Sequence, residues 1–150
     1  MARLPAVGPL RLAAICLVLA AVTLVIPAAP SYDPWSWIVW GREVVAGDLS
    51  TIGAVSWKPL PVLLTTPFSL FGDAAPDLWL LVARTLGFGA VMAAASIGCR
   101  LAGRLGGLLA GGSLLMSTWL WDPVLLGGSE GGAILFVLAA VDRHLAGRFG

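Results

Sequence analysis

The hydrophobic and polar positions of this chain fall in long blocks: apolar runs of helical length, separated by shorter polar and aromatic stretches. A helix needs about 20 apolar residues to cross the hydrocarbon core of a bilayer. Four runs approach that length, at 10–29, 78–101, 102–121 and 131–146. The pattern predicts an all-α fold: a polytopic membrane helix bundle of about four transmembrane helices in a single module.

Composition agrees with a membrane location. Hydrophobic residues make up 59% of the chain and charged residues 11%, against about 25% charged residues in typical soluble domains. No basic patch or basic helix is present, which argues against nucleic-acid binding. Cys16 and Cys99 both fall inside apolar runs and lack a histidine partner, so neither a disulfide nor a metal site is expected.

The charges are segregated, and this predicts an orientation. Six arginines stand where the first run begins, where the second meets the third, and where the fourth ends: Arg3, Arg11, Arg100, Arg104, Arg143 and Arg148. Base-rich ends mark the cytoplasmic side. We therefore expect a multi-pass plasma (inner) membrane protein with a cytoplasmic N-terminus and outer loops at 30–77 and 122–130. The first run also resembles a cleaved secretory signal, an alternative that leaves the long loop outside.

The long outer loop predicts two interfacial helices. Pro34 opens the first and Gly47 stops it, with Trp37, Val44 and either Trp40 or Gly41 on one face. The second covers 60–71 and is too short to span easily. Small residues spaced four apart in the third run predict that the last three spans pack together.

All seven tryptophans lie in two stretches between the long apolar runs, about 31–79 and 119–130. They form an aromatic belt, or some of them contact a ligand by stacking on sugar rings or covering lipid chains. Trp35 and Trp37 are the candidates for substrate contact.

Three outer carboxylates are candidates for chemistry. Asp33 follows the first run beside a proline and is either a helix N-cap or a base at the lipid–water boundary. Glu130 stands at the mouth of the fourth run and is either a charge that complements a helix dipole or a functional acid. Asp122 has a similar context but reads more simply as a turn residue before Pro123.

Three bases lie on the outer side: Arg42, Lys58 and Arg84. Arg84 falls about two turns inside the second run and is expected to face the bundle interior, where it needs an anion such as a carboxylate or phosphate. Together the three predict a site for an anionic lipid headgroup.

These residues, in this order, resemble the GT-C superfamily of membrane glycosyltransferases, particularly the polyprenyl-phosphate-sugar users related to protein O-mannosyltransferases and aminoarabinose transferases. Asp33 matches the acidic residue after the first span, and Glu130 the one before the fourth. Lys58-Pro59-Leu60 resembles the proline motif that opens the second interfacial helix, although its second proline is displaced to Pro61. Ser129-Glu130-Gly131 departs from the Arg-Pro-Asp that relatives often carry.

The resemblance implies an inverting sugar transfer, at the outer face, from a polyprenyl-phosphate carrier to an acceptor. Asp33 would be the base, and Glu130 would position the acceptor or the base. Arg42, Lys58 and Arg84 would stabilise the departing lipid phosphate. Some relatives bind a divalent metal between such carboxylates and others do not, so a metal at Asp33 and Glu130 stays open.

Two other functions remain. A non-enzymatic four-span protein, such as a lipid-binding or assembly subunit, would use the same acids and tryptophans as anchors. A transporter fragment is disfavoured, because the first and third runs carry no charge beyond their cytoplasmic ends. Enzymes of this superfamily usually have more spans, so the chain is expected to be an N-terminal fragment that is inactive alone.

Overall fold

The computed structural model describes residues 8–52 and 57–147, and over these residues the protein is helical without strands. The all-α class is therefore confirmed. The elements in chain order are α1 (Pro9–Thr23), α2 (Tyr32–Ala46), α3 (Pro59–Phe68), the 3₁₀ turn η1 (Ser69–Ala74), α4 (Ala75–Leu115), α5 (Thr118–Leu125) and α6 (Glu130–Leu145).

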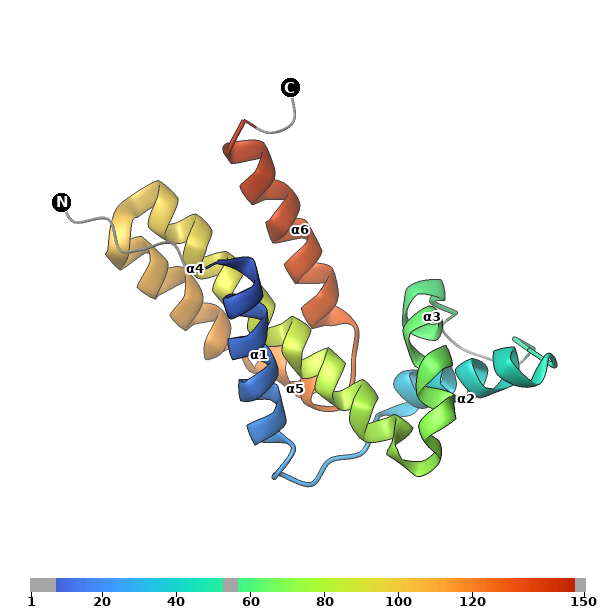
Figure 1. Ribbon diagram of the computed structural model, residues 1–150. Helices are drawn as coiled ribbons and strands as arrows, with labels where there is room; N and C mark the ends of the chain where they lie inside the picture. The colour runs from blue at the N-terminus through green and yellow to red at the C-terminus, as the bar shows by residue number, and fades with distance from the viewer. Residues whose placement is uncertain (1–7, 53–56, 148–150) are drawn as a thin grey trace.

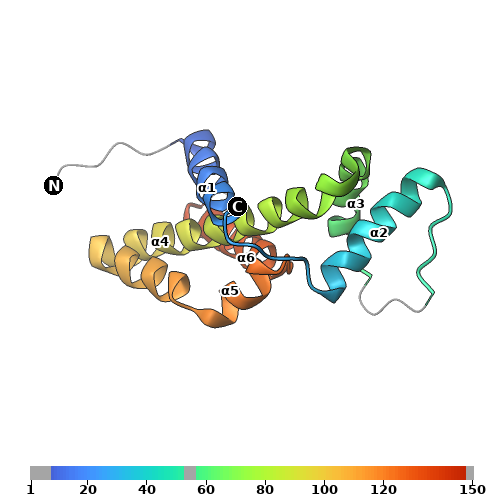
Figure 2. The same ribbon diagram turned by 90° about the horizontal axis from the view of Figure 1, so that it is seen from below.

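The helices form two groups (Figure 1). Helices α1, α4, α5 and α6 make a bundle, while α2 and α3 lie together beside the start of α4. The start of α1, the bend in α4 and the end of α6 lie at one end of the bundle, and the 126–129 turn lies at the other. Seen from below, α4 runs the length of the molecule and carries both groups (Figure 2).

Helix α4 is two helices joined by a sharp bend, as the predicted boundary at 101/102 requires. Gly103 has φ +69° and ψ −163°, a conformation essentially restricted to glycine. Beyond it the chain runs back along itself: a Cβ at Gly98 would collide with the Gly106 carbonyl, and one at Gly107 with Cys99. Small residues thus hold the two halves of α4 together, although Gly103 itself serves the bend and not the interface.

Helix α6 packs along the first half of α4. A Cβ on Gly131 would lie 2.8 Å from Gly87 Cα, and one on Gly89 would lie 3.0 Å from a methyl group of Leu135. At the far end an ion pair joins Arg100 to Asp142 at 3.0 Å. The predicted packing of the second, third and fourth runs is confirmed.

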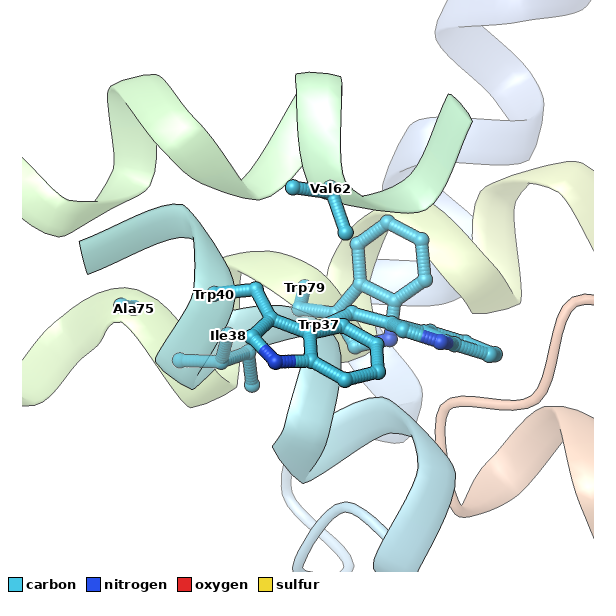
Figure 3. Close-up of a cluster of buried hydrophobic side chains, with 6 residues drawn as sticks. All are labelled: Trp37, Ile38, Trp40, Val62, Ala75 and Trp79. Carbon is cyan, nitrogen blue, oxygen red and sulfur yellow. The ribbon is translucent and has the colours of Figure 1, made fainter. Parts of the chain in front are cut away.

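Helices α2 and α3 share an aromatic core with the start of α4 (Figure 3). Trp37, Ile38 and Trp40 of α2 pack with Val62 of α3 and with Trp79 and Ala75 of α4, and all six are buried. The Trp37 and Trp79 rings meet edge to face, 5.7 Å apart at 81°. This geometry suits the quadrupoles of aromatic rings.

Close backbone contact completes the α2–α3 pair. Gly41 lies against Thr65, whose backbone would stand 2.8 Å from a Cβ at that position. The Thr65 hydroxyl donates a hydrogen bond to the Trp37 carbonyl at 2.7 Å.

The predicted face of α2 is confirmed for Trp37, Trp40 and Gly41, which are buried. It is wrong for Val44, which is 41% exposed because α3 does not reach the last turn of α2. Gly47 ends the helix at φ +78°, as predicted.

Helix length and apolar composition support fewer membrane spans than the four predicted. Among the described residues, the one helical stretch long and apolar enough to cross a bilayer is Pro59–Leu115, while Pro9–Thr23 is apolar but shorter. The third run is not one continuous helix, because α4 ends at Leu115, the chain turns at 116–117, and the last residues of the run belong to α5. Four separate spans are thus not confirmed.

Candidate functional site

The turn between α5 and α6, residues 126–129, joins the two helix groups. Its Leu126 carbonyl accepts a hydrogen bond from the Ser31 amide at 2.9 Å, and its Gly127 carbonyl accepts one from the Trp79 indole at 2.8 Å. Gly127 has φ +84°, and a Cβ there would press on Trp79 and Pro34. The beginnings of α2, α4 and α6 are therefore tied to one short turn.

Lys58 reaches this turn from α3. The residue precedes α3 in an extended conformation, and its ammonium donates to the Ser129 hydroxyl at 2.9 Å. The same nitrogen lies 5.0 Å from the centre of the Trp37 ring, within the range of a cation–π contact. A lysine ammonium has three donors, and the Ser129 bond uses one of them. Lys58 is thus a half-buried cation with donors left for a ligand.

A groove of about 370 Å³ opens beside this pair, between α3, α4 and α6. We call it the α3–α6 groove. Lys58 and Ser129 line it where α3 and α6 begin, and Leu64 and Phe136 line it further along the same helices. Its remaining walls are largely apolar: Trp57, Pro59, Leu60, Pro61, Trp79, Ala83, Leu86, Gly128, Gly132 and Ala133. The groove therefore combines one cation with a long hydrophobic wall.

Glu130 is the first residue of α6 and follows Ser129 directly. Its Oε2 is buried and has no hydrogen-bond partner within the described ranges. That oxygen lies directly against Gly128, because a Cβ atom added to this glycine would collide with it. The position suits a negative charge, because the first turn of a helix presents unpaired N–H groups.

Asp33 lies on the other helix group, in the first turn of α2. The N-cap alternative for this residue is wrong: Ser31 occupies that position, and no side chain caps the helix. Asp33 precedes Pro34, whose Cβ would lie 3.3 Å from a Cβ on Gly127. Through its chain neighbour, Asp33 therefore lies close to the 126–129 turn, but among the described residues no hydrogen bond joins its side chain to Glu130, and neither acid lines the α3–α6 groove.

The structure does not bring the acids into a metal cluster. Among the described residues, no group of three or more His, Cys, Asp or Glu side chains comes together. Asp122, expected at a turn, lies inside α5 instead, because that helix runs through Pro123 to Leu125.

The other two bases have separate partners. Arg84 is 1% exposed and faces the interior, as predicted, but it meets carbonyls and not an anion. Its NH1 donates to the Thr23 carbonyl at 2.7 Å, and its NH2 to the Leu125 carbonyl at 3.0 Å. Arg42 is exposed and donates to the Gly72 carbonyl at 3.2 Å. Of Arg42, Lys58 and Arg84, only Lys58 lines the α3–α6 groove.

The two candidate tryptophans differ. Trp37 is buried, and its ring lies against the Lys58 ammonium. Trp35 is 39% exposed and lines a different groove, on the other side of α2.

The sequence reasoning missed Ser129 and Trp79 as parts of the site. The run Gly127-Gly128-Ser129 predicts a turn. Ser129 directly precedes Glu130, and the two neighbouring polar side chains could have indicated that Ser129 belongs to the site. Nothing local indicates that Trp79 bonds to this turn, because the two are 48 positions apart.

Comparisons with family models, with curated proteins and with solved structures find no match. The site is therefore interpreted from its own geometry and chemistry.

Proposed function

We propose that the chain is a membrane glycosyltransferase module of the GT-C type, which holds a polyprenyl-phosphate-linked sugar in the α3–α6 groove. The observation that carries this proposal is the pairing of Lys58 and Ser129 with a long apolar wall. The ammonium and the hydroxyl suit a phosphate, and the apolar wall suits the first isoprene units of a lipid.

Two features support a membrane location for the bundle. Large apolar side chains point outward from it, including Leu10 at 85% exposure, Leu108 at 74% and Val137 at 63%. Exposed apolar surface of this extent is unusual for a soluble monomer and is ordinary against lipid. In addition, α1, the two halves of α4, and α6 run in alternating directions.

This alternation supports the orientation expected from the charges. Arg100, Arg104 and Arg143 lie at the end of the bundle where α4 bends and α6 finishes. The opposite end carries the 126–129 turn, α2 and α3, and in our proposal it faces outward. Helix α1 packs into the bundle through buried Cys16 and Ala20, which favours its retention over its cleavage as a signal.

In the proposed reaction, the donor phosphate binds to Lys58 and Ser129 and its lipid chain lies in the groove. Asp33 accepts the proton of the acceptor hydroxyl, whose oxygen then attacks the anomeric carbon. The bond between that carbon and the phosphate oxygen breaks on the opposite face, which inverts the centre. The phosphate leaves with the bonding electrons, and Lys58 stabilises its added charge. Glu130, at the start of α6, positions the acceptor or the base.

A transfer assay tests this proposal. Membranes from cells that express the full-length gene, as wild type, Asp33→Asn or Glu130→Gln, would be supplied with radiolabelled polyprenyl-phosphate sugars, and transfer to endogenous acceptors would be measured. Loss of a general base typically lowers the rate about 10²- to 10⁴-fold, so we expect Asp33→Asn to abolish detectable transfer.

Asp122→Asn is the matched control, because Asp122 is an exposed outer carboxylate on α5. We expect it to retain wild-type transfer at equal expression. Wild-type transfer by Asp33→Asn would contradict the catalytic assignment. Binding of the carrier without transfer by any form would favour the alternative, a non-enzymatic lipid-binding membrane protein.

A further inference from the structure

A second groove lies on the opposite side of α2 from the aromatic core. It has a volume of about 300 Å³ and is lined by Tyr32, Trp35, Ser36, Val39, Trp40, Glu43, Ser50 and Ile52. We call it the α2 groove. The members from Tyr32 to Glu43 recur at three- and four-residue steps and so share one helix face. The proposed transfer reaction uses none of this surface.

The wall of the α2 groove is fixed by two hydrogen bonds. The Glu43 carboxylate accepts one from the Ser50 amide at 3.1 Å, and the Trp40 indole donates one to the Ser50 carbonyl at 3.0 Å. Both backbone groups of Ser50 are therefore held by α2. These two hydrogen bonds give the α2 groove a defined wall.

The lining offers flat rings and oxygen acceptors together. Tyr32 is 65% exposed and Trp35 is 39% exposed, so both rings present surface to a ligand. Glu43 uses Oε2 for Ser50, and over the described part of the chain Oε1 has no hydrogen-bond partner. The Ser36 hydroxyl donates to the Tyr32 carbonyl at 3.2 Å and keeps its lone pairs free to accept.

We propose that the α2 groove binds a saccharide. The negative faces of the aromatic rings attract the weakly positive C–H groups of a sugar ring. A free carboxylate oxygen and a serine hydroxyl accept hydrogen bonds from sugar hydroxyls, and the bonds to a carboxylate are the stronger kind. The volume lies at the small end of the roughly 300–1,000 Å³ typical of ligand sites, which suits one or two sugar units.

The same features argue against the main competing occupant, a membrane surface. A helix that lies among lipid headgroups is typically rich in Lys and Arg on its polar face. This face is concave, and its one charged side chain is the acid Glu43. The saccharide assignment stands on this lining alone and does not depend on the transfer reaction, so the two can fail separately.

Ligand-observed NMR on the full chain in lipid nanodiscs tests the proposal. Saturation transfer from protein to methyl glycosides of glucose, galactose and mannose would be titrated, with glycerol as a polyol that lacks a ring face. We expect at least one glycoside, but not glycerol, to bind. Trp35→Ala should weaken that binding roughly tenfold or more, because truncated aromatic anchors carry much of a site's affinity.

Two further variants distinguish glycoside binding in the α2 groove from loss of stability and from binding to any exposed indole. Glu43→Gln keeps an oxygen that can accept from Ser50 but loses the charge, and we expect weaker glycoside binding with an unchanged thermal midpoint. Trp119→Ala removes another exposed indole, 79% exposed on α5 and outside the groove, and should leave binding unchanged.

Three results would overturn the proposal. They are the absence of saturation transfer to every glycoside, an equal loss in Trp119→Ala and Trp35→Ala, or unchanged binding in Trp35→Ala. Quenching by brominated lipids that is stronger in wild type than in Trp35→Phe, without any glycoside signal, would assign the face to the membrane instead.

Discussion

At the scale of single residues, the most consequential side chain outside the groove is Arg84. It is buried, and its guanidinium bridges the end of α1 and the end of α5 through two carbonyl groups. A planar fork with several donors suits this task better than a lysine ammonium. Because Leu125 leads directly into the 126–129 turn, Arg84 also holds the turn that presents Ser129.

We expect Arg84→Met to destabilise the protein by about 2–4 kcal/mol. The change removes three charged hydrogen bonds, two to carbonyls and one to the Thr23 hydroxyl, and leaves the partly buried Leu125 carbonyl without this donor. Arg104→Met is the matched control, because Arg104 is exposed near the α4 bend. Thermal unfolding in detergent or nanodiscs measures both. A midpoint for Arg84→Met equal to that of Arg104→Met would contradict the bridging role.

Several residue-level features could be predicted and others could not. The inward direction of Arg84 follows from the cost of exposing a charge to lipid. Its carbonyl partners could not be predicted, because they belong to segments 61 and 41 positions away. The N-cap role of Asp33 was a local interpretation that assumed a helix opened by Pro34, and it failed because the helix begins two residues earlier, at Tyr32, with Ser31 as its N-cap.

At the scale of helices, the contact between α6 and α4 sets the position of Glu130. Gly131 and Gly87 meet backbone to backbone, so the two axes approach closely at this level. The beginning of α6, with Ser129 and Glu130, is thereby held against α4 next to the groove.

We expect Gly131→Ala to destabilise the helix pair by about 1–3 kcal/mol, since its Cβ would lie 2.8 Å from Gly87 Cα and backbone cannot move aside cheaply. The same variant should weaken lipid binding by shifting Ser129. Gly112→Ala is the control: a Cβ there meets nothing within 4 Å, and alanine favours the helix. Thermal unfolding of the two variants provides the comparison, and equal midpoints would count against the close packing.

Element boundaries were largely predictable from glycines and prolines. Gly47 and Gly103 have positive φ where the sequence placed a stop and a turn, and Pro59 opens α3. The third run was misjudged beyond Leu115, because apolar content does not reveal the turn at 116–117. The burial of Trp37 against Trp79 also escaped prediction, since it depends on the partner helix.

At the scale of the whole molecule, the arrangement has two ends of different character. One end gathers the α4 bend, the Arg100–Asp142 pair and the end of α6. The other gathers α2, α3, both grooves and the 126–129 turn. The charge pattern of the sequence predicted this separation, although hydropathy alone did not establish how many helices cross a bilayer.

Cysteine labelling tests the proposed orientation. In a background with Cys16→Ala and Cys99→Ala, we expect Ser50→Cys to react with a membrane-impermeant maleimide in intact cells. Ala146→Cys, at the end of α6, should react only after permeabilisation, because base-rich ends stay in the cytoplasm. Both positions are exposed in the structure. The opposite pattern, or labelling of both in intact cells, would contradict the orientation.

The central claim is that Lys58 holds the phosphate of a lipid in the α3–α6 groove, and lipid binding tests it most directly. Farnesyl phosphate and farnesol would be titrated into nanodiscs that contain wild-type protein, Lys58→Met or Arg42→Met. A hydrogen bond to a charged group contributes about 1.5–3 kcal/mol, so wild type should bind the phosphate roughly 10- to 100-fold more tightly than the alcohol. Lys58→Met should lose that preference and Arg42→Met should keep it. An equal preference in wild type and Lys58→Met would contradict the account.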